Sequence, residues 1–192
     1  MNILDMFASY RCQHIAEFRS LLEAVAKSVL TLTENYPEEE ALEKFENDSD
    51  RQWFECGENT RHPDHKEGFL FAGFNGHSTH QYPYDDTAAK ALDRFMERYY
   101  PHIVCKRYYS VNLYQRTFEF QFEFNIDYDN AEEVSDKGLA IRNSIELFND
   151  DVAELLQHNF DNSDWAELNE YDGYKCIRFY ESGVVYISIA IN

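Results

Sequence analysis

The spacing of apolar residues along the chain predicts four helices. From Ile3 to Leu32, apolar side chains recur at steps of three and four residues, the stripe of a helix that buries one side. Pro37, followed by three glutamates, predicts a short second helix, because proline suits the first turn and carboxylates stabilise the positive end of the helix dipole. The same helical period predicts further helices over residues 87–99 and about 131–158.

A second pattern, the alternation of apolar and polar residues, predicts strands. Apolar residues occupy every second position over 118–126, the period of a strand with one buried face. The β-rich run before it would complete a hairpin over about 103–126, and a turn containing Ser-Gly predicts a second hairpin over about 174–191. A further strand is expected at residues 69–74.

The first hairpin has one register that suits both of its faces. A two-residue turn would place Val111 opposite Phe120 on the apolar face. On the polar face, Lys106 would then lie diagonally from Glu123 and Asp127. The turn itself lacks the Asn-Gly or Gly-X chemistry that two-residue loops prefer, so a longer loop is the alternative.

Strands that arrive in pairs with short connections predict a mostly antiparallel sheet, and helices on one of its faces make the fold α+β. We expect a single domain over residues 1–192, because a chain of this size buries a sufficient core without disulfides or metals. The sheet is built from the hairpins at 103–126 and 174–191, packed against the helix at 131–158 and the N-terminal helices. Residues 34–85 form a less regular excursion that is acidic and contains histidines.

Charge sharpens this picture. The chain has 36 Asp and Glu against 17 Lys and Arg, a formal net charge of −19 at pH 7. Residues 34–60, 117–136 and 161–181 account for this whole net charge, and the charges of the remaining residues sum to zero. Such a balance argues against direct binding to nucleic acid or to an anionic membrane, since phosphate groups would be repelled.

Segregated acidic segments favour a protein that binds and blocks a basic partner protein, for instance a nuclease or another nucleic-acid-binding protein. The contact would resemble that of an immunity protein, or the acidic segments would mimic nucleic acid. A charge run is also typical of a solvated face, and that interpretation stays open. The candidate contact residues are Glu38, Glu39, Glu40, Glu43, Glu46, Asp48, Asp50, Glu119, Glu123 and Asp127.

Four histidines suggest an alternative in which the chain is a metal-binding protein or a metal-dependent enzyme. His62, His65, His77 and His80 form two pairs, and imidazoles in pairs can hold zinc. Turn residues around both pairs and the absence of the cysteine pairs of structural zinc motifs favour plain loop histidines. We therefore expect no cofactor. A structural subunit of an oligomer, with its aromatic surface buried between copies, is a third alternative.

The sequence assigns no catalytic residue. It contains no nucleophile elbow, P-loop, dinucleotide fingerprint or H-E-x-x-H motif, which favours a function other than catalysis. No apolar stretch is long enough to span a bilayer, the first residues do not read as a signal peptide, and the four cysteines are scattered. These features predict a cytoplasmic protein with reduced cysteines.

Overall fold

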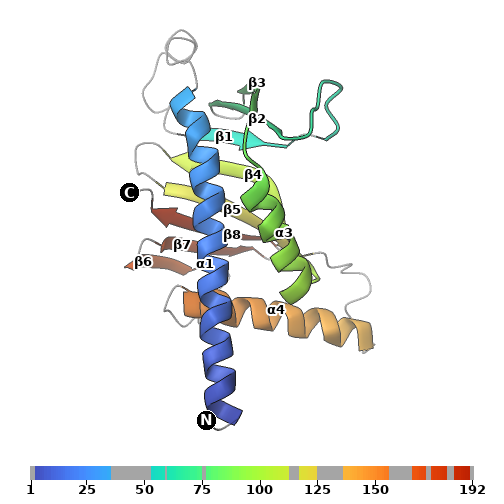
Figure 1. The fold of residues 1–192 in the computed structure, drawn as a ribbon, viewed down its shortest axis with the longest axis vertical. Coiled ribbons are helices and arrows are strands. Elements are labelled where there is room, and N and C mark those ends of the chain that lie inside the picture. The colour runs from blue at the N-terminus through green and yellow to red at the C-terminus, as the bar shows by residue number, and fades with distance from the viewer. Residues whose placement is uncertain are drawn as a thin grey trace.

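The computed structural model describes residues 3–35, 53–58, 60–74, 77–112, 117–124, 136–155, 166–171, 174–180 and 184–190. Over these residues, eight strands form one antiparallel sheet in the order β3-β2-β1-β4-β5-β8-β7-β6. The helices are α1 (Ile3–Asn35), α3 (Thr87–Tyr99) and α4 (Asp136–Leu155) (Figure 1). The strands are β1 (Trp53–Gly57), β2 (Phe69–Phe74), β3 (His77–Pro83), β4 (Ile103–Asn112), β5 (Thr117–Phe124), β6 (Ala166–Tyr171), β7 (Tyr174–Tyr180) and β8 (Val184–Ala190).

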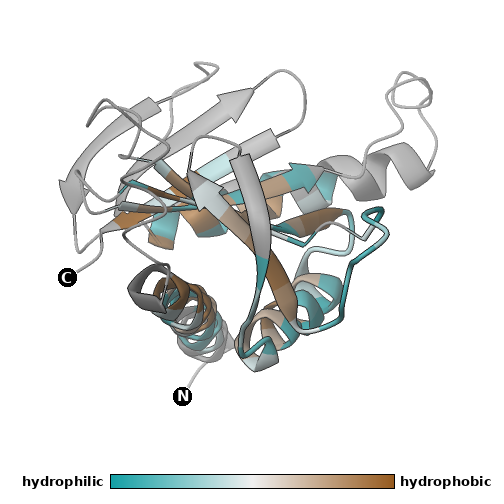
Figure 2. Ribbon diagram, turned by 90° about the horizontal axis from the view of Figure 1, so that it is seen from above, coloured by the Kyte–Doolittle hydropathy of each residue, from teal (hydrophilic) through white to brown (hydrophobic). Residues whose placement is uncertain are grey.

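The helices lie on one face of the sheet. Figure 1 shows α1 running across the strands with α3 beside it, and Figure 2 places both helices on the same side of the sheet. The predicted α+β class with an antiparallel sheet is confirmed. None of the helices in the described part of the chain is long and apolar enough to cross a membrane.

Aromatic rings form the centre of the core between this sheet face and the helices. Phe118, Phe120 and Phe122 of β5 have no exposed surface, as the alternation of phenylalanine with polar residues predicts. Phe18 of α1 meets Phe122 edge-on, with ring centroids 6.2 Å apart. Phe148 of α4 lies 5.4 Å from the Phe122 ring and brings α4 onto the same core.

The predicted register of the first hairpin is wrong by two residues. Val111 pairs with Phe118, not with Phe120, and residues 113–116 separate the two strands. A shift of two residues returns every side chain to its original face, so the apolar pattern tolerates both registers. The diagonal contact is present: Val104 pairs with Glu123, and the Lys106 ammonium, two residues further along β4, lies 2.6 Å from the Glu123 carboxylate.

The sheet is wider than two hairpins would make it. β1 and β3 lie within the stretch predicted to be less regular, and with β2 they extend the sheet beyond β4. β6 extends the opposite side. β1 and β3 escaped prediction because short, mixed sequences such as Trp-Phe-Glu-Cys-Gly carry no clear alternation. The short helix predicted after Pro37 lies outside the described residues.

Candidate functional site

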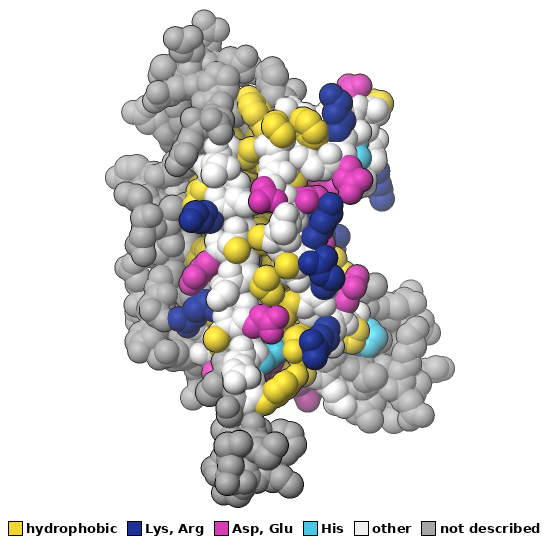
Figure 3. All heavy atoms as spheres, in the orientation of Figure 1, with side chains coloured by type: hydrophobic (Ala, Val, Ile, Leu, Met, Phe, Trp, Pro, Cys, Tyr) yellow, Lys and Arg dark blue, Asp and Glu magenta, His cyan; other side chains and the backbone are white. Residues whose placement is uncertain are grey.

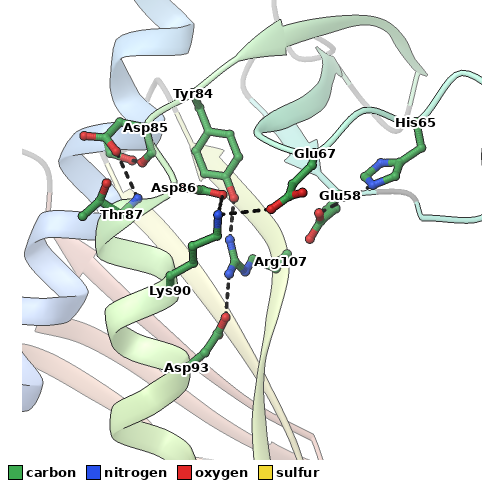
Figure 4. Close-up of polar contacts among 11 residues, drawn as sticks. Glu58, His65, Glu67, Tyr84, Asp85, Asp86, Thr87, Lys90, Asp93 and Arg107 are labelled. Atoms are coloured by element: carbon green, nitrogen blue, oxygen red, sulfur yellow. Dashed lines mark hydrogen bonds and ion pairs between the residues drawn. The ribbon is translucent and has the colours of Figure 1, made fainter.

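Arg107 is the centre of a charged junction where β4 meets the first half of α3. Its guanidinium donates to the Tyr84 hydroxyl at 2.7 Å and to the Asp93 carboxylate at 2.5 Å (Figure 4). Burial acts to lower the pKa of Arg107, but the hydrogen bonds and charges of Asp93 and Tyr84 outweigh it, so the pKa is raised. Arg107 therefore fixes α3 against the sheet as a permanent cation.

A second cation of the junction is held by two carboxylates. The Lys90 ammonium lies 2.7 Å from Asp86 and 3.3 Å from Glu67, which join the start of α3 to the loop before β2. These two hydrogen bonds raise the pKa of Lys90. Next to them, Asp85 accepts a hydrogen bond from the Thr87 amide at 3.0 Å, and hydrogen bonds from the side chain and then the backbone of Thr87 lower the pKa of Asp85.

Beside this junction, β4 and α3 enclose a cleft of about 350 Å³. It exists because β4 starts at Ile103, whereas its partner β1 reaches only as far as Tyr108. The apolar part of its lining includes Met96, Ile103 and Val104. Its acidic part consists of Glu58, Asp93 and Glu97.

Cys105 lines the cleft but is no nucleophile. Its side chain is buried, and burial raises the pKa of its thiol far above the usual range. Cys56, on β1, is fully buried, and burial raises its pKa in the same way. Both are free cysteines and act as small apolar core residues, as the sequence predicts.

The histidines predicted as metal ligands do not assemble in the described part of the chain. The His62 ring lies 4.6 Å from the Phe71 ring, and its Nδ1 accepts a hydrogen bond from the Asp64 amide. His65 Nε2 lies 3.7 Å from the Glu58 carboxylate. His77 and His80 belong to β3, but their side chains lie outside the described residues. Among the described residues, no three His, Cys, Asp or Glu side chains are placed to hold a metal ion.

The sheet face that points away from the helices carries carboxylates. Glu55, Ser110, Glu119 and Ser188 form one row across β1, β4, β5 and β8. Glu55 and Glu119 therefore lie two strands apart, roughly 10 Å. Further along the same face, the Glu123 side chain is 38% exposed. Three partly accessible carboxylates thus share this face, which we call the open face.

Apolar and basic side chains accompany these carboxylates. Tyr108 is 40% exposed and Val104 is 47% exposed, both on β4. The Tyr108 hydroxyl is hydrogen-bonded to Glu55, and burial followed by the charge of Glu55 raises the pKa of Tyr108. Lys106 partly neutralises Glu123.

The opposite, helix-covered side has a mixed sign. Figure 3 shows Lys and Arg side chains gathered over α3 with carboxylates among them. The exposed basic residues of α3 are Lys90, Arg94 and Arg98.

The structure places only two of the residues predicted to contact a partner. Glu119 and Glu123 lie on β5 and point to the open face, opposite the buried phenylalanines. The other eight predicted contact residues, Glu38, Glu39, Glu40, Glu43, Glu46, Asp48, Asp50 and Asp127, lie outside the described residues.

Sequence reasoning missed a buried polar cluster that joins the three helices. The Tyr100 hydroxyl donates to Asp151 Oδ2 at 2.7 Å, and His14 Nε2 lies 2.8 Å from the Tyr100 hydroxyl and 3.2 Å from the same carboxylate. Because the tyrosine hydrogen goes to Asp151, His14 Nε2 carries a hydrogen and is the donor. Arg11, on the surface, covers the other oxygen of Asp151 at 3.4 Å.

All three side chains of this cluster are buried. Tyr100, Asp151 and His14 are 0%, 2% and 8% exposed. His14 Nδ1 has no hydrogen-bond partner among the described residues, and its ring stacks on Phe95. The sequence contains one indication that His14 is buried: it precedes the buried Phe18 by one helical turn and so lies on the apolar stripe of α1.

Comparison of the chain with family models, with curated proteins and with solved structures finds no match. The buried cluster is closed to a ligand, whereas the open face and the cleft are accessible.

Proposed function

We propose that the protein binds a basic partner protein through the open face of its sheet and thereby blocks that partner. The observation that carries the proposal is the open face itself, where Glu55, Glu119 and Glu123 surround partly exposed Tyr108 and Val104. Protein interfaces combine apolar contacts of this kind with charges that select and steer the partner. The net charge of −19 extends the attraction to a basic protein beyond the contact.

An immunity-type contact fits this face better than mimicry of nucleic acid. Glu119 and Glu123 are four residues apart on one strand, roughly 13 Å. Duplex DNA presents on the order of eight phosphates over that length. The carboxylates of β5 are too widely spaced to reproduce that charge density. We therefore propose recognition of a folded basic surface by a few charges and apolar contacts.

The contact with Lys106 offers a way to tune binding. Lys106 lies 2.6 Å from Glu123, so a cationic partner must compete with it. Replacing Lys106 with Gln removes the competitor and adds one net negative charge. We expect the partner to bind about two- to fivefold more tightly to this variant, in keeping with an exposed ion pair.

The experiment starts with capture of a partner, its identification and its purification. Its affinity is then measured by calorimetry for the wild type and for the Glu55→Gln/Glu119→Gln and Glu55→Lys/Glu119→Lys variants. The matched control is Glu17→Lys/Glu23→Lys, which makes the same charge change on exposed positions of α1. We expect the open-face reversal to weaken binding about tenfold or more, and the control to weaken it much less.

Salt and activity complete the test. Raising NaCl from 50 to 300 mM should weaken binding of the wild type, because exposed charges are screened over roughly 10 Å. Saturating the partner with this protein should abolish the partner's own activity. The proposal is wrong if affinity is the same for the wild type and the open-face reversal, or if the complex forms without affecting the partner. A dimer of this chain that open-face reversal dissociates would also contradict it.

A further inference from the structure

The cleft between α3 and β4 has a composition that selects its ligand. Met96, Pro101 and Ile103 offer it an apolar wall, and the protonated thiol of Cys105 adds to that wall. The charged part of the lining consists of three carboxylates, those of Glu58, Asp93 and Glu97, and of the Arg107 guanidinium. A ligand that fills this cleft must bury an aliphatic portion and present a cation.

The charges of the cleft are only partly compensated from within the chain. Arg107 is committed to Asp93 and Tyr84, which cancels one carboxylate. Among the described residues, the ion-pair partner of Glu58 is the imidazole of His65, at 3.7 Å. Glu97 makes no ion pair with any described side chain. Two carboxylates thus remain beside an apolar wall.

This lining disfavours other ligand classes. Anions would be repelled by the carboxylates. A bare divalent ion needs several oxygen or nitrogen ligands in close geometry, and the described residues offer no group of three. A purely apolar ligand would desolvate the carboxylates without compensation.

We propose that the cleft binds a primary alkylammonium group, with its methylenes along Met96 and Ile103 and its ammonium between Glu58 and Glu97. The same recognition occurs within the chain, where the Lys90 ammonium is held between Asp86 and Glu67. The ammonium can belong to a free polyamine or to a lysine of the basic partner. The first source is independent of the proposed function, and the second rests on it.

The first measurement is a titration of isotope-labelled protein with n-pentylammonium, followed by NMR, with n-pentanol as the neutral control of equal length. Saturable shifts at Met96 and at residues 103–107, absent with the alcohol, are expected. Glu58→Gln and Glu97→Gln should each weaken binding roughly fivefold, the effect of one exposed ion pair. Glu17→Gln, an exposed change on α1, should leave it unchanged.

Three results overturn the inference: equal binding of the alcohol, unchanged affinity in the Glu58→Gln/Glu97→Gln variant, or shifts that spread over the open face without saturating at the cleft. Spermidine then separates the two sources. Binding at least tenfold tighter than that of pentylammonium assigns a free polyamine. Displacement of bound spermidine by the partner identifies the ammonium as that of a lysine of the partner. If spermidine neither binds more tightly nor is displaced, the inference is also overturned.

The two proposals fail separately. If open-face reversal weakens the partner while the cleft variants bind pentylammonium unchanged, the proposed function stands and the cleft inference falls. If pentylammonium binds at the cleft and spermidine binds at least tenfold more tightly, while open-face reversal has no effect, the cleft inference stands for a free polyamine and the proposed function falls.

Discussion

Removing the hydroxyl group of Tyr100 tests whether the buried cluster holds the three helices together. The side chain of Tyr100 is fully buried, and its hydroxyl donates to the charged Asp151 at 2.7 Å while accepting from His14 at 2.8 Å. A hydrogen bond to a charged group contributes about 1.5–3 kcal/mol. In Tyr100→Phe the imidazole keeps Asp151 as its acceptor, at 3.2 Å, so no second group is left unpaired. We expect a loss of about 2 kcal/mol, or about 4–8 °C in Tm for a domain of this size.

Asp151→Ala should cost more, because the Tyr100 hydroxyl loses its acceptor while buried and the His14 Nε2–H is left with the Tyr100 oxygen alone. Breaking a buried charged network in this way costs about 3–5 kcal/mol. In that background the tyrosine hydroxyl no longer has a carboxylate to bind. The Tyr100→Phe/Asp151→Ala double variant removes that unpaired hydroxyl but also the last acceptor of His14 Nε2–H. These two effects oppose each other, so the double variant should be about as stable as Asp151→Ala alone.

Equilibrium unfolding in urea, followed by circular dichroism and tryptophan fluorescence, measures these free energies of unfolding. The matched control is Tyr10→Phe, which removes a hydroxyl group from a 54% exposed ring that contacts the Tyr99 hydroxyl at 3.4 Å. It should cost less than about 0.5 kcal/mol. The reasoning is refuted if Tyr100→Phe costs no more than this control, or if the two substitutions of the double variant add independently.

Three further results are expected from the same molecule. Burial raises the pKa of Tyr100 and of Tyr109, so these tyrosines ionise at lower pH in the unfolded chain than in the folded one. Their contribution to stability is complete below about pH 10, and above it the free energy of unfolding should fall by about 1.4 kcal/mol per pH unit for each tyrosine. Unfolding titrations up to pH 12 would show this loss, and a stability that does not change with pH would contradict it. Gly57→Ala should destabilise the sheet by about 1–3 kcal/mol, because a Cβ there would lie 2.7 Å from the Tyr108 ring, and Tyr108→Ala should largely rescue it in thermal melts. Arg107→Met should weaken the attachment of α3 to β4, because it leaves the half-buried Asp93 carboxylate without its ion-pair partner. Amide hydrogen exchange at the start of α3 should then be faster, and unchanged exchange would show that the ion pair is dispensable.

The parts of the fold that the sequence predicts are those with strong local signals. α3 spans the predicted residues because its apolar positions follow the helical period and a proline comes directly after it. The strand with alternating phenylalanines is β5, with the predicted face buried. Its register was not predictable, because registers that differ by two residues bury the same side chains, and the turn sequence did not choose between them.

The candidate sites depend on contacts between distant residues and were correspondingly harder to predict. Lys106 and Glu123 were paired correctly, since a hairpin brings them together locally. His14 lies 86 residues before Tyr100 and 137 before Asp151, and no local pattern links them. The cleft arises from the unequal lengths of β1 and β4, a property of the assembled sheet.

The position of β8 determines when this molecule can fold. β5 lies near the middle of the sheet, and its second neighbour is β8, which pairs Phe120 with Ile187 across a long sequence separation. During synthesis, the hairpin of β4 and β5 therefore exposes a row of unpaired backbone groups until residues 184–190 emerge. We expect slow folding dominated by long-range contacts, and aggregation of chains that stop before β8.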